Sequence, residues 1–367
     1  MKLDKAICLL KEIESYQEQA YIVGGYVRDW IRGIPTEDID ICTSMTPVQL
    51  KQHFQVKREN YGSSFIQYQG SLFEVTTFRK EQGSNDHRHP LEVSYTDVLR
   101  EDLKRRDFRM NTLCMNSNKE VIDLLHGKED ILEKKIVCVG DPRVRLEEDA
   151  LRILRAIRFA TVLDFTIDPK LSQAMVEKKT LLNSISYERK RKELDLIFST
   201  DPEKGRTLLI EHQLLDCLEL TKLKEVTLCS EPICIWYQLD VENKYPFTRK
   251  EKKLFSVFRK YEGKEIDVDT LYRFDRFTLS CLAELHAIPK DQVFKQKQSL
   301  PIQTRKDIQI TSQELLQYVP SHMLSRVYEA LEHAILERQI KNNHQEIIEW
   351  VVIYFLKCPI FENAFLS

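Results

Sequence analysis

The sequence of 367 residues predicts an α+β N-terminal domain followed by an all-α region. Two observations support this fold class. From residue 1 to about 125, segments with helical spacing of apolar residues alternate with short runs of period two, which indicates a small domain of helices and strands. After Asp141 and Pro142 the strand patterns become rare, and helical spacing continues through segments such as EEDALRILRAIRFATVL.

The first elements follow in order from this patterning. Apolar residues three or four positions apart predict a helix at the N terminus, and AYIVGG at 20–25 predicts a strand that two glycines stop. One or two helical turns are predicted for VRDWIRG at 27–33, and DIDIC at 38–42 alternates as a strand does. The stretch SFIQYQGSLFEVTTFR at 64–79 predicts two strands joined by a turn at Gly70–Ser71.

The composition narrows the class of protein. The chain has 55 Lys and Arg residues against 57 Asp and Glu, so any binding of nucleic acid would depend on local clusters of charge. Nine cysteines without a Cys-x-x-Cys pair favour reduced thiols in a cytoplasmic protein over a disulfide or zinc framework. The N terminus has no signal-peptide pattern, and no run of about 18 apolar residues predicts a membrane span.

Asp38 and Asp40 form the first candidate site. In a strand, side chains two positions apart share a face, so the two carboxylates would project together while Ile39 and Ile41 enter the opposite layer. A divalent cation relieves the repulsion between paired carboxylates, and Mg²⁺ prefers such oxygen ligands. The alternative, a solvated strand end, is the more common meaning of this short motif.

Gly24 and Gly25 strengthen the case for a site. They end one predicted strand just before a helix begins, where backbone N–H groups are bare and a phosphate can approach closely. Arg28 lies one turn into that helix. Neither a G-x-G-x-x-G nor a Walker A motif is present, which argues against a dinucleotide or P-loop site.

Six blocks carry a resemblance to a known family. They are GGYVRDWIRGIPTEDIDICTS, FEVTTFR, EDLKRRDFRMN, VIDLLHGKEDI, VGDPRVRLEEDALRILRAIRFA and SYERKRKEL, in this order between residues 24 and 194. The chain thereby resembles the class II tRNA nucleotidyltransferase and poly(A) polymerase superfamily, and most of all the CCA-adding enzymes of Gram-positive bacteria. The rest of the chain is similar only in being helical.

This resemblance implies an architecture and a reaction. A polymerase β-like nucleotidyltransferase palm domain, the head, would span 1–138, followed by an all-α neck at 139–200, body at 201–270 and tail at 271–367. The head would bind Mg²⁺ through Asp38 and Asp40. The enzyme would add or repair the 3′-terminal CCA of tRNA with CTP and ATP and release pyrophosphate. Glu74, on the strand LFEVTTFR, is a candidate third carboxylate.

Asp149 and Arg152 are the candidate base-reading pair. On one continuous helix they would share a face, because they are three positions apart. This spacing alone is more typical of a surface ion pair. The resemblance implies that they pair with the incoming base. A carboxylate acceptor beside a guanidinium donor matches cytosine and adenine, which both present an amine next to an unprotonated ring nitrogen, and mismatches uracil and guanine.

The resemblance implies further nucleotide contacts. Asp107 and Asn111 match the ribose-side block, where an amide can hydrogen-bond a 2′-hydroxyl. Contacts to the nucleotide are implied for Arg106, Arg155 and Arg158, with solvated charge as the alternative for Arg158. Gly25 and Arg28 are nucleotide-binding candidates from the glycine turn described above. Glu188, Arg189 and Glu193 are expected to form helix-bracing ion pairs.

Residues 80–97 are polar, contain Gly and Pro, and predict a mobile loop. Within them SNDHRHPLEV, with Asp86 and Arg88, resembles the loop of enzymes that switch from C to A addition. CC-adding relatives lack much of that loop, so its presence disfavours a CC-only enzyme. An A-adding or CC-adding half-enzyme, a poly(A) polymerase and a catalytically idle RNA-binding relative remain alternatives.

The helical C-terminal half is expected to bind the acceptor stem and T arm of tRNA through phosphate contacts and shape. Its best local signal is TRKEKKLFSVFRKYEGK at 248–264, where cations occur among aromatic residues: Arg249, Lys250, Lys252, Lys253, Arg259 and Lys260. An ordinary solvated helix is the alternative. No membrane partner is expected, and a homodimer is possible.

Overall fold

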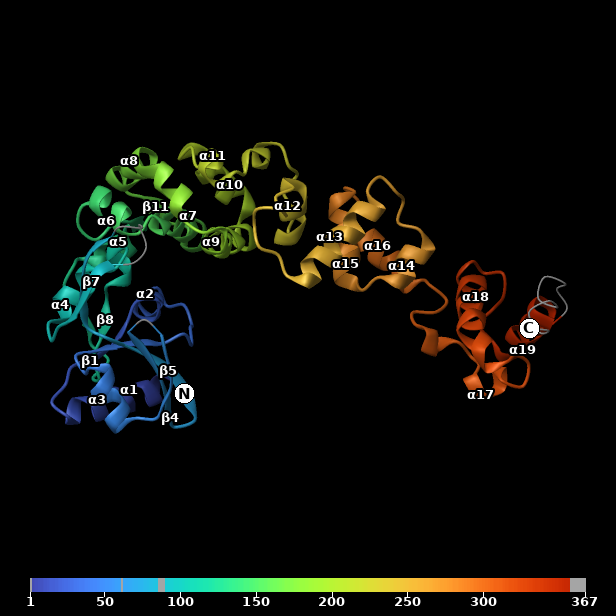
Figure 1. Cartoon of the computed structure of the whole chain (residues 1–367), viewed down its shortest axis with the longest axis horizontal. Helices are drawn as coiled ribbons and strands as arrows, with labels where there is room; N and C mark the ends of the chain where they lie inside the picture. The colour runs from blue at the N-terminus through green and yellow to red at the C-terminus, as the bar shows by residue number, and fades with distance from the viewer. Residues whose placement is uncertain (1, 61, 85–89, 357–367) are drawn as a thin grey trace. The chain divides into compact units, whose positions relative to one another are not determined.

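The computed structural model describes residues 2–60, 62–84 and 90–356 (Figure 1). The chain divides into two compact units. The first comprises Met1–Leu228 with Leu239–Pro246, and the second comprises Cys229–Gln238 with Phe247–Ser367. The predicted boundaries of head, neck, body and tail are finer than this division and stay predictions.

A mixed seven-stranded sheet forms the centre of the N-terminal part, in the order β3-β4-β5-β2-β1-β8-β9. Strands β2 and β5 pair in parallel, and the other neighbours are antiparallel. Its strands are β1 (Ala20–Val23), β2 (Asp40–Thr43), β3 (Val56–Asn60), β4 (Ser63–Tyr68), β5 (Ser71–Thr77), β8 (Cys114–Met115) and β9 (Val121–Ile122). The predicted strands at 20–25 and 64–79 are confirmed.

Short helices accompany this sheet. They are α1 (Lys2–Ser15), α2 (Gly25–Ile31), α3 (Pro47–His53), α4 (Leu99–Lys104), the 3₁₀ turn η1 (Arg109–Asn111) and α5 (Gly127–Leu132). The predicted N-terminal helix is confirmed as α1, which buries Leu3, Ile7, Leu10 and Ile13 along one face, as helical spacing of apolar residues requires.

The hairpin between β4 and β5 turns one residue earlier than predicted. Its two turn residues are Gln69 and Gly70, with φ of 45° and 75°, and Ser71 already belongs to β5. Two consecutive positive φ values define the two-residue turn that matches strand twist, and glycine tolerates this conformation best.

The prediction of a mobile loop over 80–97 is wrong for most of its length. Residues Arg79–Ser84 form β6 and Pro90–Tyr95 form β7, which pair antiparallel as a separate hairpin. Polar composition concealed these strands, because they carry little of the apolar alternation that marks a half-buried strand. Asp86 and Arg88 lie outside the described residues.

Helices dominate after Pro142, as predicted. In the first unit they are α6 (Pro142–Glu148), α7 (Leu151–Leu163), α8 (Pro169–Lys178), η2 (Lys179–Ser184), α9 (Tyr187–Thr200), α10 (Pro202–Glu211), α11 (Leu215–Leu218) and η3 (Thr221–Lys224). Helices α7 and α9 pack side by side. A two-residue parallel pair, β10 (Lys135–Ile136) with β11 (Thr166–Ile167), links the end of the head to this helical layer.

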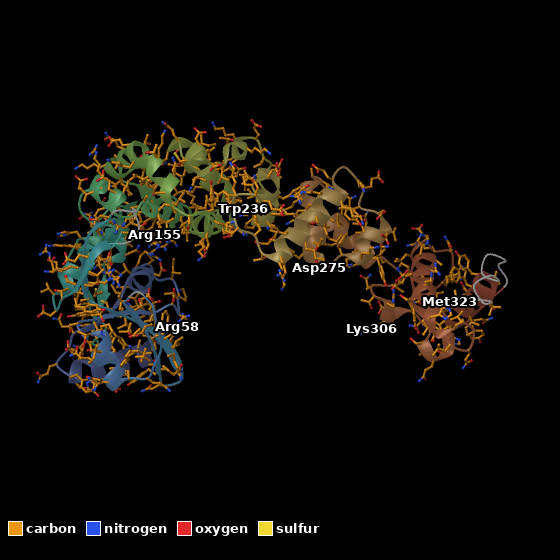
Figure 2. The ribbon with its side chains drawn as sticks, viewed as in Figure 1. Arg58, Arg155, Trp236, Asp275, Lys306 and Met323 are labelled. Carbon is orange, nitrogen blue, oxygen red and sulfur yellow. The ribbon has the colours of Figure 1, made fainter. Side chains whose placement is uncertain are left out.

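The second unit is helical. Its elements are α12 (Pro232–Leu239), α13 (Arg249–Tyr261), α14 (Val268–Arg273), α15 (Arg276–Leu285), α16 (Lys290–Gln298), η4 (Arg305–Asp307), α17 (Ser312–Leu315), η5 (Ser321–Met323), α18 (Leu324–Leu336), α19 (His344–Val351) and a π-helical turn at Val352–Leu356. Figure 2 labels Trp236 of α12, which is fully buried, and Met323, which belongs to a separate apolar cluster between Ile302 and Val351. Among the described residues no helix has both the length and the apolar character needed to cross a bilayer.

Candidate active site

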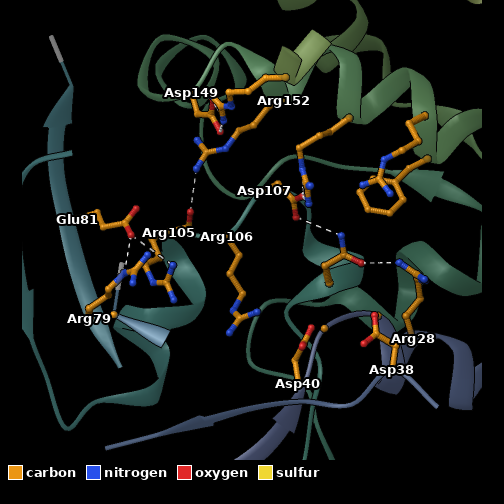
Figure 3. Close-up of a pocket in the computed structure, with 18 of the residues that line it drawn as sticks. Arg28, Asp38, Asp40, Arg79, Glu81, Arg105, Arg106, Asp107, Asp149 and Arg152 are labelled. Carbon is orange, nitrogen blue, oxygen red and sulfur yellow. Dashed lines mark hydrogen bonds and ion pairs between the residues drawn. The ribbon is translucent and has the colours of Figure 1, made fainter. Parts of the chain in front are cut away.

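A cavity of about 1010 Å³ lies in the first unit, between the sheet and helices α4, α7 and α9 (Figure 3). It brings together eleven of the predicted residues: Gly25, Arg28, Asp38, Asp40, Arg106, Asp107, Asn111, Asp149, Arg152, Arg155 and Arg158. These residues lie up to 133 positions apart in the sequence, from Gly25 to Arg158, and their individual roles stay predictions. Glu74 does not line this cavity but lies beside Asp40.

Asp38 and Asp40 lie at the sheet end of the cavity. The expectation that both belong to one strand is wrong, because β2 begins at Asp40 and Asp38 lies in the loop before it. Ile39 and Ile41 are 3% and 0% exposed, so they anchor the segment in the core as predicted. The buried isoleucines fix the direction in which the carboxylates point.

Glu74 completes a group of three carboxylates. It stands directly opposite Asp40 in the parallel pairing of β2 with β5, and directly paired residues of neighbouring strands project to the same face. Burial, together with the negative charges of Asp38 and Glu74, raises the pKa of Asp40 to about 6, while the charge of Arg106 acts in the opposite direction. The carboxylates repel one another, so a hard divalent cation fits this donor set.

A chain of hydrogen bonds crosses the middle of the cavity (Figure 3). Arg28 Nη1 donates to Asn111 Oδ1 at 2.9 Å, and Asn111 Nδ2 donates to Asp107 Oδ1 at 3.2 Å. Arg155 Nε of α7 donates to Asp107 Oδ2 at 2.9 Å. Burial alone would raise the pKa of Asp107, but the charge of Arg155 and the hydrogen bonds from Arg155, Asn111 and the Phe108 backbone hold that pKa at about 2.

Asp149 and Arg152 lie at the opposite end of the cavity from Asp38 and Asp40 (Figure 3). The expected continuous helix is wrong, because α6 ends at Glu148, Asp149 is extended with φ −145° and ψ 100°, and α7 starts at Leu151. The two side chains therefore do not share a helical face. The break turns the Asp149 carboxylate out of the helix and into the cavity.

Asp149 and Arg152 have separate partners. The Asp149 carboxylate accepts from the Leu151 N–H at 3.2 Å and from Arg189 Nη2 at 3.3 Å. The Arg152 guanidinium donates to the carbonyl oxygens of Arg145 at 2.6 Å and Arg105 at 2.9 Å. These contacts fix both groups independently, in contrast to the surface ion pair that was the alternative interpretation.

Arg158 and Glu193 hold α7 against α9. Arg158 Nε lies 2.6 Å from Glu193 Oε2, and the guanidinium lies 4.1 Å from the centre of the Phe159 ring. The helix-bracing role expected for Glu193 agrees with this contact. Arg189 was expected to brace helices as well, but it lines the cavity beside Asp149, and its Nη1 is buried without a hydrogen-bond partner.

The β6–β7 hairpin contributes residues that the sequence did not identify. Arg79, Glu81, Val93 and Tyr95 line the cavity. Glu81 Oε1 accepts from Arg79 Nε at 2.7 Å and lies 3.4 Å from Nη1 of Arg105 on the segment after α4. Arg105 could have been predicted, because it precedes Arg106 in the block KRRDFRMN. The hairpin residues were missed because residues 80–97 were predicted to be a loop.

The predicted tRNA-binding cations all lie on α13 of the second unit. Thr248 caps this helix and exchanges hydrogen bonds with Glu251 in a capping box. Phe255 and Phe258 are buried on one face, so these aromatics belong to the core. The six cations Arg249, Lys250, Lys252, Lys253, Arg259 and Lys260 are all exposed.

Three family models match the chain. Residues 20–137 match the Poly A polymerase head domain, 164–222 match the probable RNA and SrmB-binding site of polymerase A, and 244–351 match tRNA nucleotidyltransferase domain 2. The CCA-adding enzymes of Bacillus mycoides and Bacillus subtilis are each 31% identical to this chain over 95% of its length, covering 98% and 97% of their own.

Solved structures show the same fold. The Bacillus stearothermophilus CCA-adding enzyme in complex with CTP aligns with a TM-score of 0.76 at 24% identity, covering 96% of this chain and 97% of its own. The Thermotoga maritima CCA-adding enzyme complexed with tRNA aligns with a TM-score of 0.65 at 18% identity, covering 96% of this chain and 93% of its own.

Fold and cavity together define a nucleotidyltransferase with a mixed-sheet head followed by helical domains, which confirms the predicted fold class. The relatives align along nearly the whole of both chains. The chain belongs to the family of CCA-adding enzymes, and the resemblance drawn from the six blocks is confirmed.

Proposed function

We propose that this chain adds or repairs the 3′-terminal CCA of tRNA, using CTP and ATP and releasing pyrophosphate. Membership of the CCA-adding family supports the reaction. The observation that carries the proposal is the layout of the cavity, which has paired carboxylates at one end, a carboxylate and a guanidinium suited to base recognition at the other, and arginines between them.

The charge of the cavity suits a nucleoside triphosphate. Its lining includes eight arginines and five carboxylates, so the wall is cationic even though the whole chain has a net charge of −2. A low-dielectric site with fixed guanidinium groups binds phosphates more strongly than exposed lysines would. Arg106, beside Asp40 and with its Nε buried and without a partner, is the best placed to bind a phosphate oxygen.

Asp38 and Asp40, with Glu74 beside them, would hold Mg²⁺. When bound, the ion would neutralise charge on the triphosphate and favour ionisation of the tRNA 3′-hydroxyl, which then attacks the α-phosphate in line as pyrophosphate leaves. The protein residues supply position: Asp107 and Asn111 face the ribose side, and Asp149 with Arg152 hold the base. Fixed geometry of this kind accounts for most of the catalysis in phosphoryl transfer.

The helical C-terminal half would bind the tRNA. The exposed cations of α13 would contact phosphates of the acceptor stem and T arm, whereas Phe255 and Phe258 are buried and do not stack on the RNA. A cytoplasmic location belongs to the same proposal. A homodimer stays a prediction.

The deciding experiment uses tRNAs that end before CCA, after C and after CC, each incubated with labelled CTP or ATP. We expect ordered addition of C, C and A followed by arrest. Addition of A only to the tRNA ending in CC would identify an A-adding half-enzyme, and addition of C alone would identify a CC-adding one. Long runs of A would identify a poly(A) polymerase.

A further inference from the structure

A cluster of thiols with one carboxylate lies in the second unit, and none of its residues lines the catalytic cavity. Cys229 precedes α12, Cys234 belongs to α12, and Cys281 and Glu284 share a face of α15 three residues apart. The three cysteines are 3%, 0% and 0% exposed. The sequence contains no Cys-x-x-Cys pair, but Cys229 and Cys234 are separated by four residues, a spacing that also occurs between the ligands of structural zinc sites.

The ligand atoms of this cluster converge. Sγ of Cys229, Sγ of Cys234 and a carboxylate oxygen of Glu284 all lie within 4.8 Å of one another. In tetrahedral zinc sites, bonds of about 2.3 Å to sulfur and about 2.0 Å to oxygen place ligand atoms roughly 3.5 Å apart. A contraction of at most about 1.3 Å would bring the three ligand atoms to these separations.

The surroundings hold the ligands in place. Gln238 Nε2 donates to Cys229 Sγ at 3.4 Å. Glu284 Oε1 accepts from the Ser230 N–H at 3.0 Å and lies 2.9 Å from Lys290 Nζ, while Oε2 accepts from the Glu231 N–H at the longer distance of 3.4 Å. Such outer contacts orient the ligands of metal sites, and here they leave Glu284 Oε2 the less occupied oxygen.

The charges balance around a divalent cation. Two thiolates and one carboxylate carry three negative charges, the cation supplies two positive charges and Lys290 supplies the third. A buried group of this kind needs such compensation. On binding, the Cys229 and Cys234 thiols each release one proton to solvent and each sulfur forms one bond to the metal, with no oxidation or reduction.

We propose that Cys229, Cys234 and Glu284 bind a soft divalent transition metal of the zinc class, which joins the segment before α12 to α15. Thiolate ligands select such a metal over Mg²⁺, which prefers oxygen. The site is structural, since both thiols are buried and none of the three ligands lines the catalytic cavity.

The test uses Co²⁺ as the probe on the full reduced chain, because thiolate coordination gives a charge-transfer band that carboxylate sites do not. We expect the band to saturate at one equivalent, and to be unchanged in Cys217→Ser, whose thiol lies outside the cluster, and in Asp40→Asn. The Cys229→Ser/Cys234→Ser variant should lose the band. Glu284→Gln, which keeps an oxygen acceptor for the Ser230 N–H, should bind Co²⁺ at least about tenfold more weakly.

Absence of the band in the reduced wild-type chain would overturn the proposal, and so would a band of equal affinity in Glu284→Gln. A Cys229–Cys234 disulfide found by mass spectrometry, together with no band after its reduction, would show that the cluster is a redox pair and not a metal site. Circular dichroism of each variant separates loss of the metal from loss of the fold.

Discussion

Asp40 should destabilise the metal-free protein at neutral pH. Burial and the charges of Asp38 and Glu74 raise the pKa of this carboxyl from 3.8 to about 6. The folded state therefore binds a proton that the unfolded state has already released between about pH 4 and pH 6. Stability falls as pH rises through this window, and above it the full penalty of the ionised carboxylate is present. Replacing Asp40 with Asn removes the charge at nearly constant shape.

The magnitude follows from the two pKa values. A difference of about two pH units corresponds to about 3 kcal/mol, at roughly 1.4 kcal/mol per unit. Asp40 is partly exposed and a neighbouring arginine offsets part of the repulsion, so we expect Asp40→Asn to gain about 1 to 2 kcal/mol at about pH 7.5. The gain should shrink toward zero near pH 4, while nucleotidyl transfer is lost at every pH.

Urea unfolding in the presence of a chelator, at about pH 7.5 and about pH 4, measures this difference. Glu37→Gln is the matched control, because Glu37 is an exposed carboxylate in the same loop, and we expect its stability to stay within about 0.5 kcal/mol of wild type. Equal or lower stability of Asp40→Asn at both pH values would refute the reasoning. So would a gain that grows as pH falls.

Three further predictions concern the reaction and its substrate. Asp149→Ala or Arg152→Ala should lower the preference for CTP and ATP over UTP and GTP by at least about tenfold, because a site that pairs buried polar groups can discriminate by up to roughly 10⁴-fold. Unchanged incorporation ratios with the four nucleotides would contradict the assignment. Asp38→Ala should abolish transfer with an unaltered circular dichroism spectrum, and near wild-type turnover would contradict the cation assignment. The double variant Lys252→Glu/Lys253→Glu should weaken tRNA binding. The slope of the logarithm of the binding constant against the logarithm of the salt concentration should become shallower by the equivalent of up to about two phosphate contacts. An unchanged slope would show that these lysines are only solvated.

The parts of the fold that sequence predicted best are those where apolar spacing is strong. Helix α1 and the hairpin of β4 and β5 have clear periodicity, and so they were predicted to within a residue or two. The β6–β7 hairpin was missed because its strands are polar. The break at Asp149 was also missed, because the apolar spacing on both sides of it is helical and no Gly or Pro marks the interruption.

The residues of the candidate site also differ in how well the sequence predicted them. Asp38, Arg106 and Asp149 were named as site residues because they lie in blocks that resemble the CCA-adding family, and all three line the cavity. Arg79 ends the block FEVTTFR but no role was predicted for it, and Glu81 lies outside the blocks. Their place in the cavity depends on tertiary pairing of β6 with β7, which local sequence does not encode.

The three consecutive residues 105–107 connect the separate walls of the cavity. Arg105 contacts Glu81 of the β6–β7 hairpin and its carbonyl oxygen accepts from Arg152, so the hairpin and the base-reading end share one anchor. Arg106 lies near Asp40, and Asp107 accepts from Arg155 of α7. Buried Asp102 holds both Arg105, at 2.8 Å, and Arg106, at 3.2 Å. Because one carboxylate fixes the first two of these residues, a shift of the hairpin would reach the carboxylate end and the base-reading end through the same short segment.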